Sequence, residues 1–167
     1  YALLGDFDKA RTLVDTRDTE SFTPWISRGR LALWSQDRAW AEQARAQLQQ
    51  RPRSIQTDMA LATLTCVVTR QAPENAPDLV MLAEQPGTPA RRRAFFNQLD
   101  CEFTSYIGLS ERAVQSLMRA VDGGLVDLAW MDRCPILADL RKDPRFGPLR
   151  ALVAERASKI EAAFFAT

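Results

Sequence analysis

The chain has 167 residues, of which 46% are hydrophobic, and a formal net charge of +1. This length suffices for one domain with a continuous core, and the charge balance provides no bulk attraction to nucleic acid or an anionic membrane. The sequence has no histidine, which removes the commonest general base and the commonest metal ligand.

No apolar run approaches the roughly 18 residues that a membrane span needs, and the first residues lack a signal-peptide pattern. The chain begins with Tyr1, and residues 1–5 are typical of the end of a helix. We therefore expect the chain to be the C-terminal part of a longer protein. We expect it in the cytoplasm, with a periplasmic domain of a membrane-anchored regulator as the alternative.

Turn-forming residues divide the chain into segments of helical length, and strand signals are weak. The turns are expected at Thr23-Pro24, Arg51-Pro52, Pro73 to Pro77, Pro86 to Pro89, Gly123-Gly124, Cys134-Pro135 and Asp143-Pro144. No Gly/Ser-rich linker or low-complexity tract separates these segments, which favours one domain.

Several segments carry strong helix signals. Residues 54–71 and 89–107 place their apolar side chains at the spacing of one helix face. Asp143 can cap a helix whose first turn holds Pro144, where a missing N–H costs nothing. This predicts a helix over residues 145–163, which would cover the last apolar surface of the domain.

The chain repeats itself with a shift of about 34 residues. Ala32, Cys66 and Cys101 form a column of small residues in the first helix of successive repeats. The second helices share an aliphatic column, which consists of Val14, Leu48, Leu82 and Leu117. Small residues at fixed places indicate close helix crossings, and stacked helix pairs bury apolar faces that one pair alone leaves exposed.

This period and its turns resemble the tetratricopeptide repeat family. The segment from Gly5 to Ala10 is similar to that family's turn into its second helix, which has Gly, an aromatic residue and then Ala. The segment from Gly108 to Ala113 is similar but lacks the aromatic residue. Arg28, Ala62 and Asn97 stand where the family has Trp in its first helix, so the repeats are degenerate.

The resemblance implies an all-α fold in which antiparallel helix hairpins stack into a right-handed α-solenoid. We assign residues 1–125 to the repeats and residues 126–167 to C-terminal capping helices of the same domain. The tail from Leu137 to Leu149 is similar to a closing segment that follows such repeats in bacterial regulators and sensory kinases.

The family lines its concave groove with first helices, and the resemblance carries this groove onto three sets of residues. They are Leu33, Gln36 and Asp37, then Thr63, Val67 and Arg70, then Gln98, Glu102 and Ser105. The sets mix both signs of charge and lack a dense cluster of basic residues, so we expect an extended or helical partner segment rather than a captured terminal carboxylate.

Other candidate sites have simpler interpretations. The cysteines form no CxxC motif, and Cys66 and Cys101 belong to the column of small residues, whereas Cys134 is expected to be more accessible. Trp40 could be an exposed anchor, and the basic run Arg91–Arg93 could contact an acidic partner or RNA, although a solvated helix start explains it as well. We predict no catalytic residue, no metal and no cofactor.

The sequence therefore predicts a protein-interaction or regulatory scaffold in a larger bacterial signalling or transcription-regulatory protein, and not an enzyme. Its partner would be a peptide or a neighbouring domain, of the same protein or of another, with no membrane insertion and no nucleic acid. Two alternatives stay open at this point. One is a small-ligand sensor domain of a transcription regulator or protein kinase, and the other is a homodimerisation module.

Overall fold

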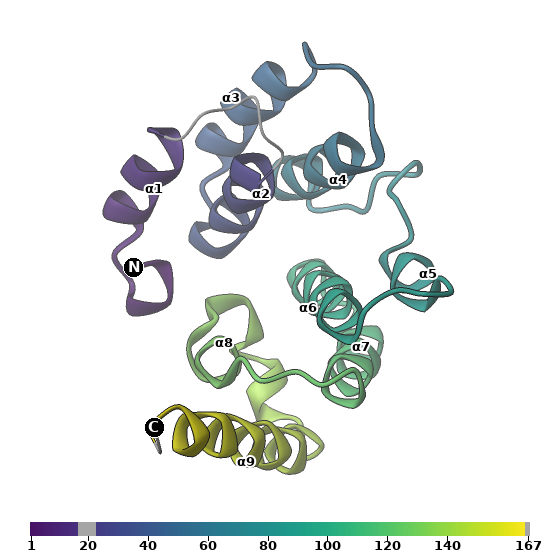
Figure 1. Cartoon of the computed structure of the whole chain (residues 1–167). Coiled ribbons are helices and arrows are strands. Elements are labelled where there is room, and N and C mark those ends of the chain that lie inside the picture. Colours follow the sequence, from purple (N-terminus) through teal and green to yellow (C-terminus); the bar gives the residue numbers. More distant parts are fainter. Residues whose placement is uncertain (17–22, 166–167) are drawn as a thin grey trace. The chain divides into compact units, whose positions relative to one another are not determined.

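The computed structural model describes residues 1–16 and 23–165, which form helices and no strand. The all-α prediction is therefore confirmed for this part of the chain. The helices form two compact units, Tyr1–Pro77 and Asp78–Thr167, each of which is described by itself (Figure 1). The solenoid arrangement and the division at residue 125 stay predictions.

The first unit is built from a short 3-10 helix and four α-helices. They are η1 (Ala2–Leu4), α1 (Phe7–Asp15), α2 (Thr23–Ser35), α3 (Arg38–Leu48) and α4 (Ile55–Thr69). Helix α2 packs against α1, α3 and α4, and α3 also packs against α4. Ser54 and Thr57 form a capping box at the start of α4, so the helix begins where its first orphan N–H groups find acceptors.

The second unit begins with a very short helix and ends with a long one. Its elements are α5 (Leu79–Glu84), α6 (Ala90–Tyr106), α7 (Ser110–Asp122), α8 (Leu128–Arg133), η2 (Pro135–Leu137), η3 (Leu140–Lys142) and α9 (Phe146–Phe165). Helix α6 packs against α5 and α7, while α9 packs against α7 and α8.

The helix boundaries agree closely with those expected from the sequence. The segments 54–71, 89–107 and 145–163 correspond to α4, α6 and α9. Asp143 ends η3, and its carboxylate accepts a hydrogen bond of 2.9 Å from the backbone N–H of Arg145, the residue before α9. Pro144 therefore lies before α9 and not in its first turn. Differences of about one or two residues at a helix end carry no structural meaning, because helix ends fray.

Helix α5 departs from the repeat pattern because it starts late and has 6 residues, against 11 in α3 and 13 in α7. The prolines at 73 and 77 disfavour a helix before residue 78. Asp78 then caps α5 by accepting 3.0 Å hydrogen bonds from the backbone N–H groups of Val80 and Met81.

The column of small residues lies in the cores of the two units. Ala32, Cys66 and Cys101 are each 0% exposed. Cys134 is also 0% exposed, so the expectation that it would be more accessible is wrong. Trp40 is buried as well, with the guanidinium of Arg11 at 4.9 Å from its ring centroid, and it does not serve as an exposed anchor.

Candidate functional site

The groove residues predicted in the first unit have two different environments. Leu33 and Val67 are buried, at 1% and 2% exposure, so these side chains contribute to packing. Thr63 is half-buried and donates a 3.0 Å hydrogen bond to the carbonyl of Met59. Its side chain lies against Gly29, where an added Cβ would come within 3.3 Å of it.

The remaining residues of that set lie at helix ends. Gln36 and Arg70 are exposed, and the Arg70 guanidinium donates a 3.1 Å hydrogen bond to the side-chain oxygen of Gln36. Asp37 is half-buried and caps α3 through a 2.9 Å hydrogen bond from the N–H of Trp40. This backbone hydrogen bond, with help from the paired Arg11 guanidinium, lowers the pKa of Asp37.

The groove residues predicted in the second unit are mostly inside it. Gln98 is 7% exposed, Glu102 is 1% exposed and Ser105 is half-buried. The Glu102 carboxylate accepts a 2.6 Å hydrogen bond from the indole N–H of Trp130 and thereby joins α6 to α8. A buried carboxylate with such a partner holds helices together, so Glu102 acts here as a packing residue.

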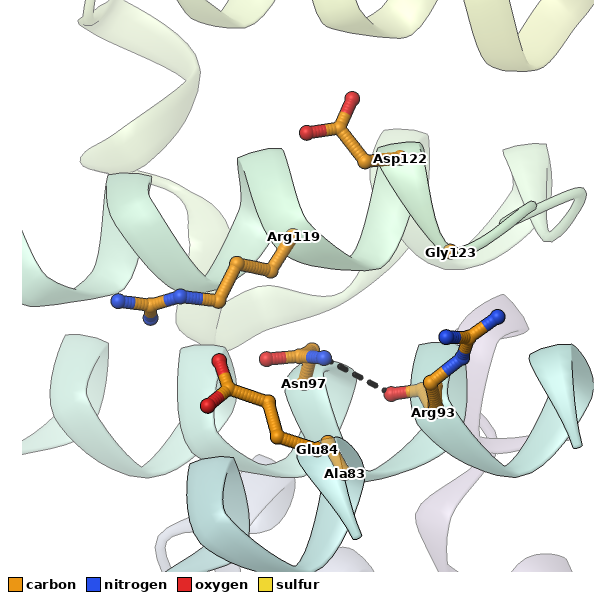
Figure 2. Close-up of a pocket in the computed structure, with 7 residues that line it drawn as sticks. All are labelled: Ala83, Glu84, Arg93, Asn97, Arg119, Asp122 and Gly123. Carbon is orange, nitrogen blue, oxygen red and sulfur yellow. Dashed lines mark hydrogen bonds between the residues drawn. The ribbon is translucent and has the colours of Figure 1, made fainter. Parts of the chain in front are cut away.

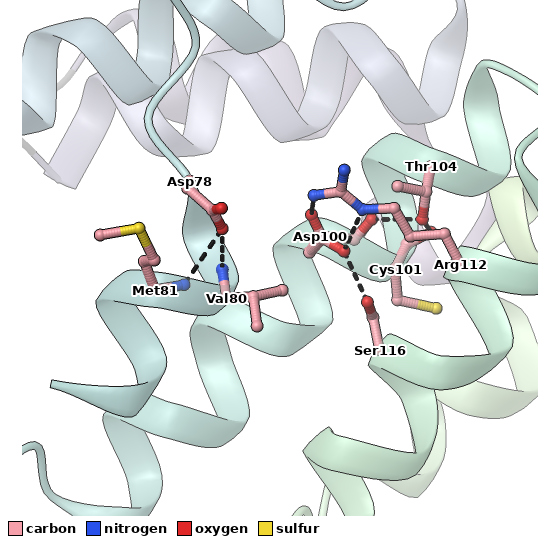
Figure 3. Close-up of polar contacts among 8 residues, drawn as sticks. All are labelled: Asp78, Val80, Met81, Asp100, Cys101, Thr104, Arg112 and Ser116. Atoms are coloured by element: carbon pink, nitrogen blue, oxygen red, sulfur yellow. Dashed lines mark hydrogen bonds and ion pairs between the residues drawn. The ribbon is translucent and has the colours of Figure 1, made fainter.

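A second buried carboxylate joins α6 to α7 (Figure 3). Asp100 is 2% exposed and accepts hydrogen bonds of 2.7 and 3.3 Å from Arg112 and one of 2.5 Å from the hydroxyl of Ser116. The hydrogen bonds to Asp100 raise the pKa of Arg112, which stays charged. Burial raises the pKa of the neighbouring Cys101 thiol well above its usual range, so this thiol is a poor nucleophile.

The strongest candidate for a ligand site is a pocket of about 230 Å³ in the second unit (Figure 2). Residues of α5, α6 and α7 and the first residue after α7 line it, and they are Ala83, Glu84, Arg93, Asn97, Arg119, Asp122 and Gly123. We call it the α5–α6–α7 pocket. Both signs of charge are present in its wall, together with one buried amide.

The end of α7 comes close to α6 beside the pocket. A Cβ added at Gly123 would lie 3.4 Å from the backbone N of Ala94 in α6, which is an ordinary van der Waals contact, and 3.1 Å from the carbonyl oxygen of Arg119 in α7 itself. The end of α7 therefore lies directly against the first turns of α6, next to the pocket.

Asn97 is the most unusual group in the pocket. It is 4% exposed, and its side-chain N–H donates a 2.9 Å hydrogen bond to the carbonyl of Arg93. Its side-chain oxygen is buried and has no hydrogen-bond partner among the described residues. An unpaired buried acceptor costs about 1–3 kcal/mol, so this oxygen marks a place where a donor would be stabilised.

The charged groups of the pocket are also unpaired. Glu84, Arg93, Arg119 and Asp122 form no ion pair with any residue that the structure describes. Elsewhere in the second unit carboxylates and guanidiniums do pair, as Asp132 does with Arg150 at 2.5 Å. The pocket thus keeps four charges available to a ligand.

A second pocket, of about 240 Å³, lies in the first unit and is lined in part by Arg28 and Trp40. Arg28 is 5% exposed, donates a 3.1 Å hydrogen bond to Asp15 and stacks at 4.6 Å from the Trp25 ring centroid. Arg28 and Asn97 stand at the same place in the repeat alignment. The sequence analysis singled out these two positions as departures from the family's Trp, but it did not indicate that pockets would form beside them.

Two searches of the described residues concern metal ligands and membrane-spanning helices. No group of three or more Asp, Glu or Cys side chains within 1–16 and 23–165 could hold a metal ion. None of the helices in these ranges combines the length and the apolar character that crossing a bilayer requires.

Comparisons of the chain with protein-family models, curated proteins and solved structures gave no match.

Proposed function

We propose that this chain is a protein-interaction module of a bacterial signalling or transcription-regulatory protein, which binds a partner segment on stacked helix hairpins. It would act by holding its partner in place, with no covalent step. The observation that carries the proposal is the recurrence of one local structure at the repeat period. Gln36 and Arg70, 34 residues apart, follow equivalent helices and share a left-handed backbone, with φ values of 55° and 61°.

Further equivalent positions support the same proposal. Gly5 and Gly108 precede the second helices α1 and α7 and have φ values of 84° and 82°. Only glycine adopts this region without strain. The first and last of these turns thus share one backbone conformation, and the two middle ones share another at Gln36 and Arg70. This partial recurrence supports stacked hairpins and the extended binding surfaces that such stacks provide.

The structure changes which residues are suitable as partner contacts. Leu33, Val67 and Glu102 are buried, whereas Gln36 and Arg70 expose their polar groups at the ends of α2 and α4. We therefore propose that a partner segment contacts the surface around Gln36 and Arg70. A polar surface with one basic group suits a partner segment that carries acidic and amide side chains.

A site-specific crosslinking experiment tests this proposal. A photoreactive amino acid is placed at Gln36, at Arg70 or, as a control, at Gln50, which is exposed beyond the end of α3. After irradiation in lysate of the source organism, we expect one protein to be crosslinked from Gln36 and Arg70 and not from Gln50. The double variant Gln36→Glu/Arg70→Glu should abolish its retention in a pull-down while circular dichroism stays unchanged.

Two results would overturn the proposal. One is crosslinking to the same proteins from all three positions, which would mean nonspecific contact. The other is retention of the partner by the double variant. A variant at Glu102 is unsuitable for this test, because its carboxylate is buried against Trp130 and its replacement would disturb packing.

A further inference from the structure

We propose that the α5–α6–α7 pocket binds a small zwitterion of the free α-amino acid class. The proposal does not depend on partner binding near Gln36 and Arg70. It rests on three properties of the pocket: an amide oxygen without a donor, unpaired charges of both signs, and a small volume.

The ammonium group would bind between Asn97 and Glu84, after a small movement of the side chains that cover the buried Asn97 oxygen. The amide orientation of Asn97 is fixed, because the reverse orientation would place its oxygen against the carbonyl oxygen of Arg93, which accepts the 2.9 Å hydrogen bond. Figure 2 shows the Asn97 oxygen and the Glu84 carboxylate directed toward the same space. Two acceptors directed toward one space favour a positively charged donor in that space.

The carboxylate group would bind to a guanidinium. Arg119 and Arg93 both line the pocket, and Figure 2 shows their guanidiniums on opposite sides of Asn97. Neither arginine forms an ion pair with a described residue. A guanidinium presents two parallel N–H groups to a carboxylate, which makes arginine the preferred partner of this group.

Because the pocket contains charges of both signs, it is poorly suited to a ligand that carries only one charge. A simple anion would bring its charge close to Glu84 and to the unpaired amide oxygen of Asn97. A simple cation would satisfy these groups and leave the guanidiniums unpaired. A zwitterion whose charges are separated by a single carbon atom meets both requirements.

The size of the pocket limits the ligand further. About 230 Å³ is below the usual range of roughly 300–1,000 Å³ for sites that take drug-sized molecules. The apolar part of the wall includes Ala83, which is 0% exposed, and the backbone of Gly123. A compact amino acid with a short side chain fits this space better than a peptide or a nucleotide.

The competing explanation is closure of the pocket by the protein itself. Arg119 is half-buried, and its long side chain could turn toward Glu84 and Asn97. The Arg119 guanidinium would then donate to the amide oxygen of Asn97 and pair with Glu84, without any ligand. Binding measurements decide between these possibilities, because a pocket closed in this way has no affinity for an amino acid.

Isothermal titration calorimetry with the purified chain provides the test. The probes are the common amino acids up to about 10 mM, together with the N-acetyl derivative and the carboxamide of any amino acid that binds. We expect at least one unmodified amino acid to bind. Each derivative lacks one charge and should bind at least about 10-fold more weakly, since about 1.4 kcal/mol corresponds to that factor.

Matched variants locate the binding site. Glu84→Gln and Arg119→Gln should each weaken binding at least about 10-fold, and Asn97→Phe should abolish it by filling the pocket. The controls Glu161→Gln and Arg92→Gln remove exposed charges outside the pocket and should bind as the wild type does. Circular dichroism and urea midpoints establish that each variant is folded.

Three outcomes would overturn the proposal. The first is that no amino acid binds to the folded wild type, which is the result expected if Arg119 closes the pocket. The second is unchanged binding in both Glu84→Gln and Arg119→Gln, which would place the ligand elsewhere. The third is equal binding of the N-acetyl derivative or the carboxamide, which would mean that one of the two charges is not recognised.

Discussion

The Arg70 guanidinium donates a 3.1 Å hydrogen bond to the side chain of Gln36, the residue one repeat period earlier in the chain. Both residues terminate first helices in the left-handed region, with φ values of 61° and 55°. Most residues other than glycine are strained there, by about 1–2 kcal/mol. The two first helices thus end in the same left-handed conformation, although α3 begins at Arg38, soon after Gln36, and α5 begins only at Leu79.

This strain predicts that Gln36→Gly stabilises the protein. Glycine adopts a positive φ without strain, so we expect the free energy of unfolding to rise by about 0.5–1 kcal/mol, despite the loss of one exposed hydrogen bond. Urea denaturation measures the change. The control Ala46→Gly, at an exposed site inside α3, should lower the free energy of unfolding by about 1 kcal/mol. Equal destabilisation by both variants would contradict the left-handed turn.

The ion pair between Asp100 and Arg112 predicts unequal effects of its two partners. The side chain of Asp100 is 3% exposed and that of Arg112 is 49% exposed. Arg112→Ala leaves a charged carboxylate inside the protein and should lower the free energy of unfolding by about 3 kcal/mol. Asp100→Asn keeps the size of the side chain and frees Arg112 to turn into water, so we expect a loss of about 1–2 kcal/mol. Urea denaturation that ranks the two variants in the opposite order would refute this argument.

The burial of the three cysteines predicts that their thiols react slowly with a thiol reagent. Cys66, Cys101 and Cys134 are each 0% exposed, and burial raises the pKa of Cys66 to about 12. Since the thiolate is the reactive form, we expect a thiol reagent at pH 8 to label the native protein only after urea is added. In the variant Ala46→Cys, the added thiol is exposed, so the reagent should label this one thiol at once without urea. Fast labelling of the native wild type would show that a cysteine is accessible.

The contacts of Arg145 predict a pH-dependent stability. Its guanidinium donates to Asp143 and Glu111 at 2.9 Å, and with the Arg145 backbone N–H it lowers the pKa of Asp143 to about 2. It also lowers the pKa of Glu111. A lowered carboxylate pKa stabilises the folded state above the ordinary pKa near 4, and this stability is lost as the pH falls toward 2.

The variant Arg145→Gln tests this dependence. The urea midpoints of wild type and variant should differ at pH 6 and converge as the pH falls from about 5 to about 2. The control Arg91→Gln removes an exposed guanidinium without an ion pair to any described residue, so its difference from the wild type should stay constant over this range. A constant difference for Arg145→Gln as well would exclude the proposed linkage.

The helices were predictable because their signals are local. Proline positions and the apolar spacing of residues 54–71 lie within or next to the segment that they define, and α4 begins and ends within two residues of the predicted bounds. The column of Ala32, Cys66 and Cys101 was predictable from the period, because helices that cross closely at equivalent places need small residues there.

The burial and the hydrogen-bond partners of the polar groups were not predictable, because they depend on distant parts of the chain. Glu102 was expected at a binding surface, yet its partner Trp130 is 28 residues away and no local pattern reveals this hydrogen bond. The predicted turns at Pro73 to Pro77 and Pro86 to Pro89 bound helix α5, but they do not indicate a pocket beside it. Its late start leaves the α5–α6–α7 pocket beside Asn97, and this opening depends on how three helices pack.

The unpaired amide oxygen of Asn97 has a consequence for the redesign of this chain. Three helices already wall the space beside Asn97, and charged groups already line it. A binding site at this place needs neither an added loop nor a new domain. A redesigned chain with an apolar residue at position 97 would gain stability there. It would also lose the strongest candidate for chemical recognition among the described residues of the second unit.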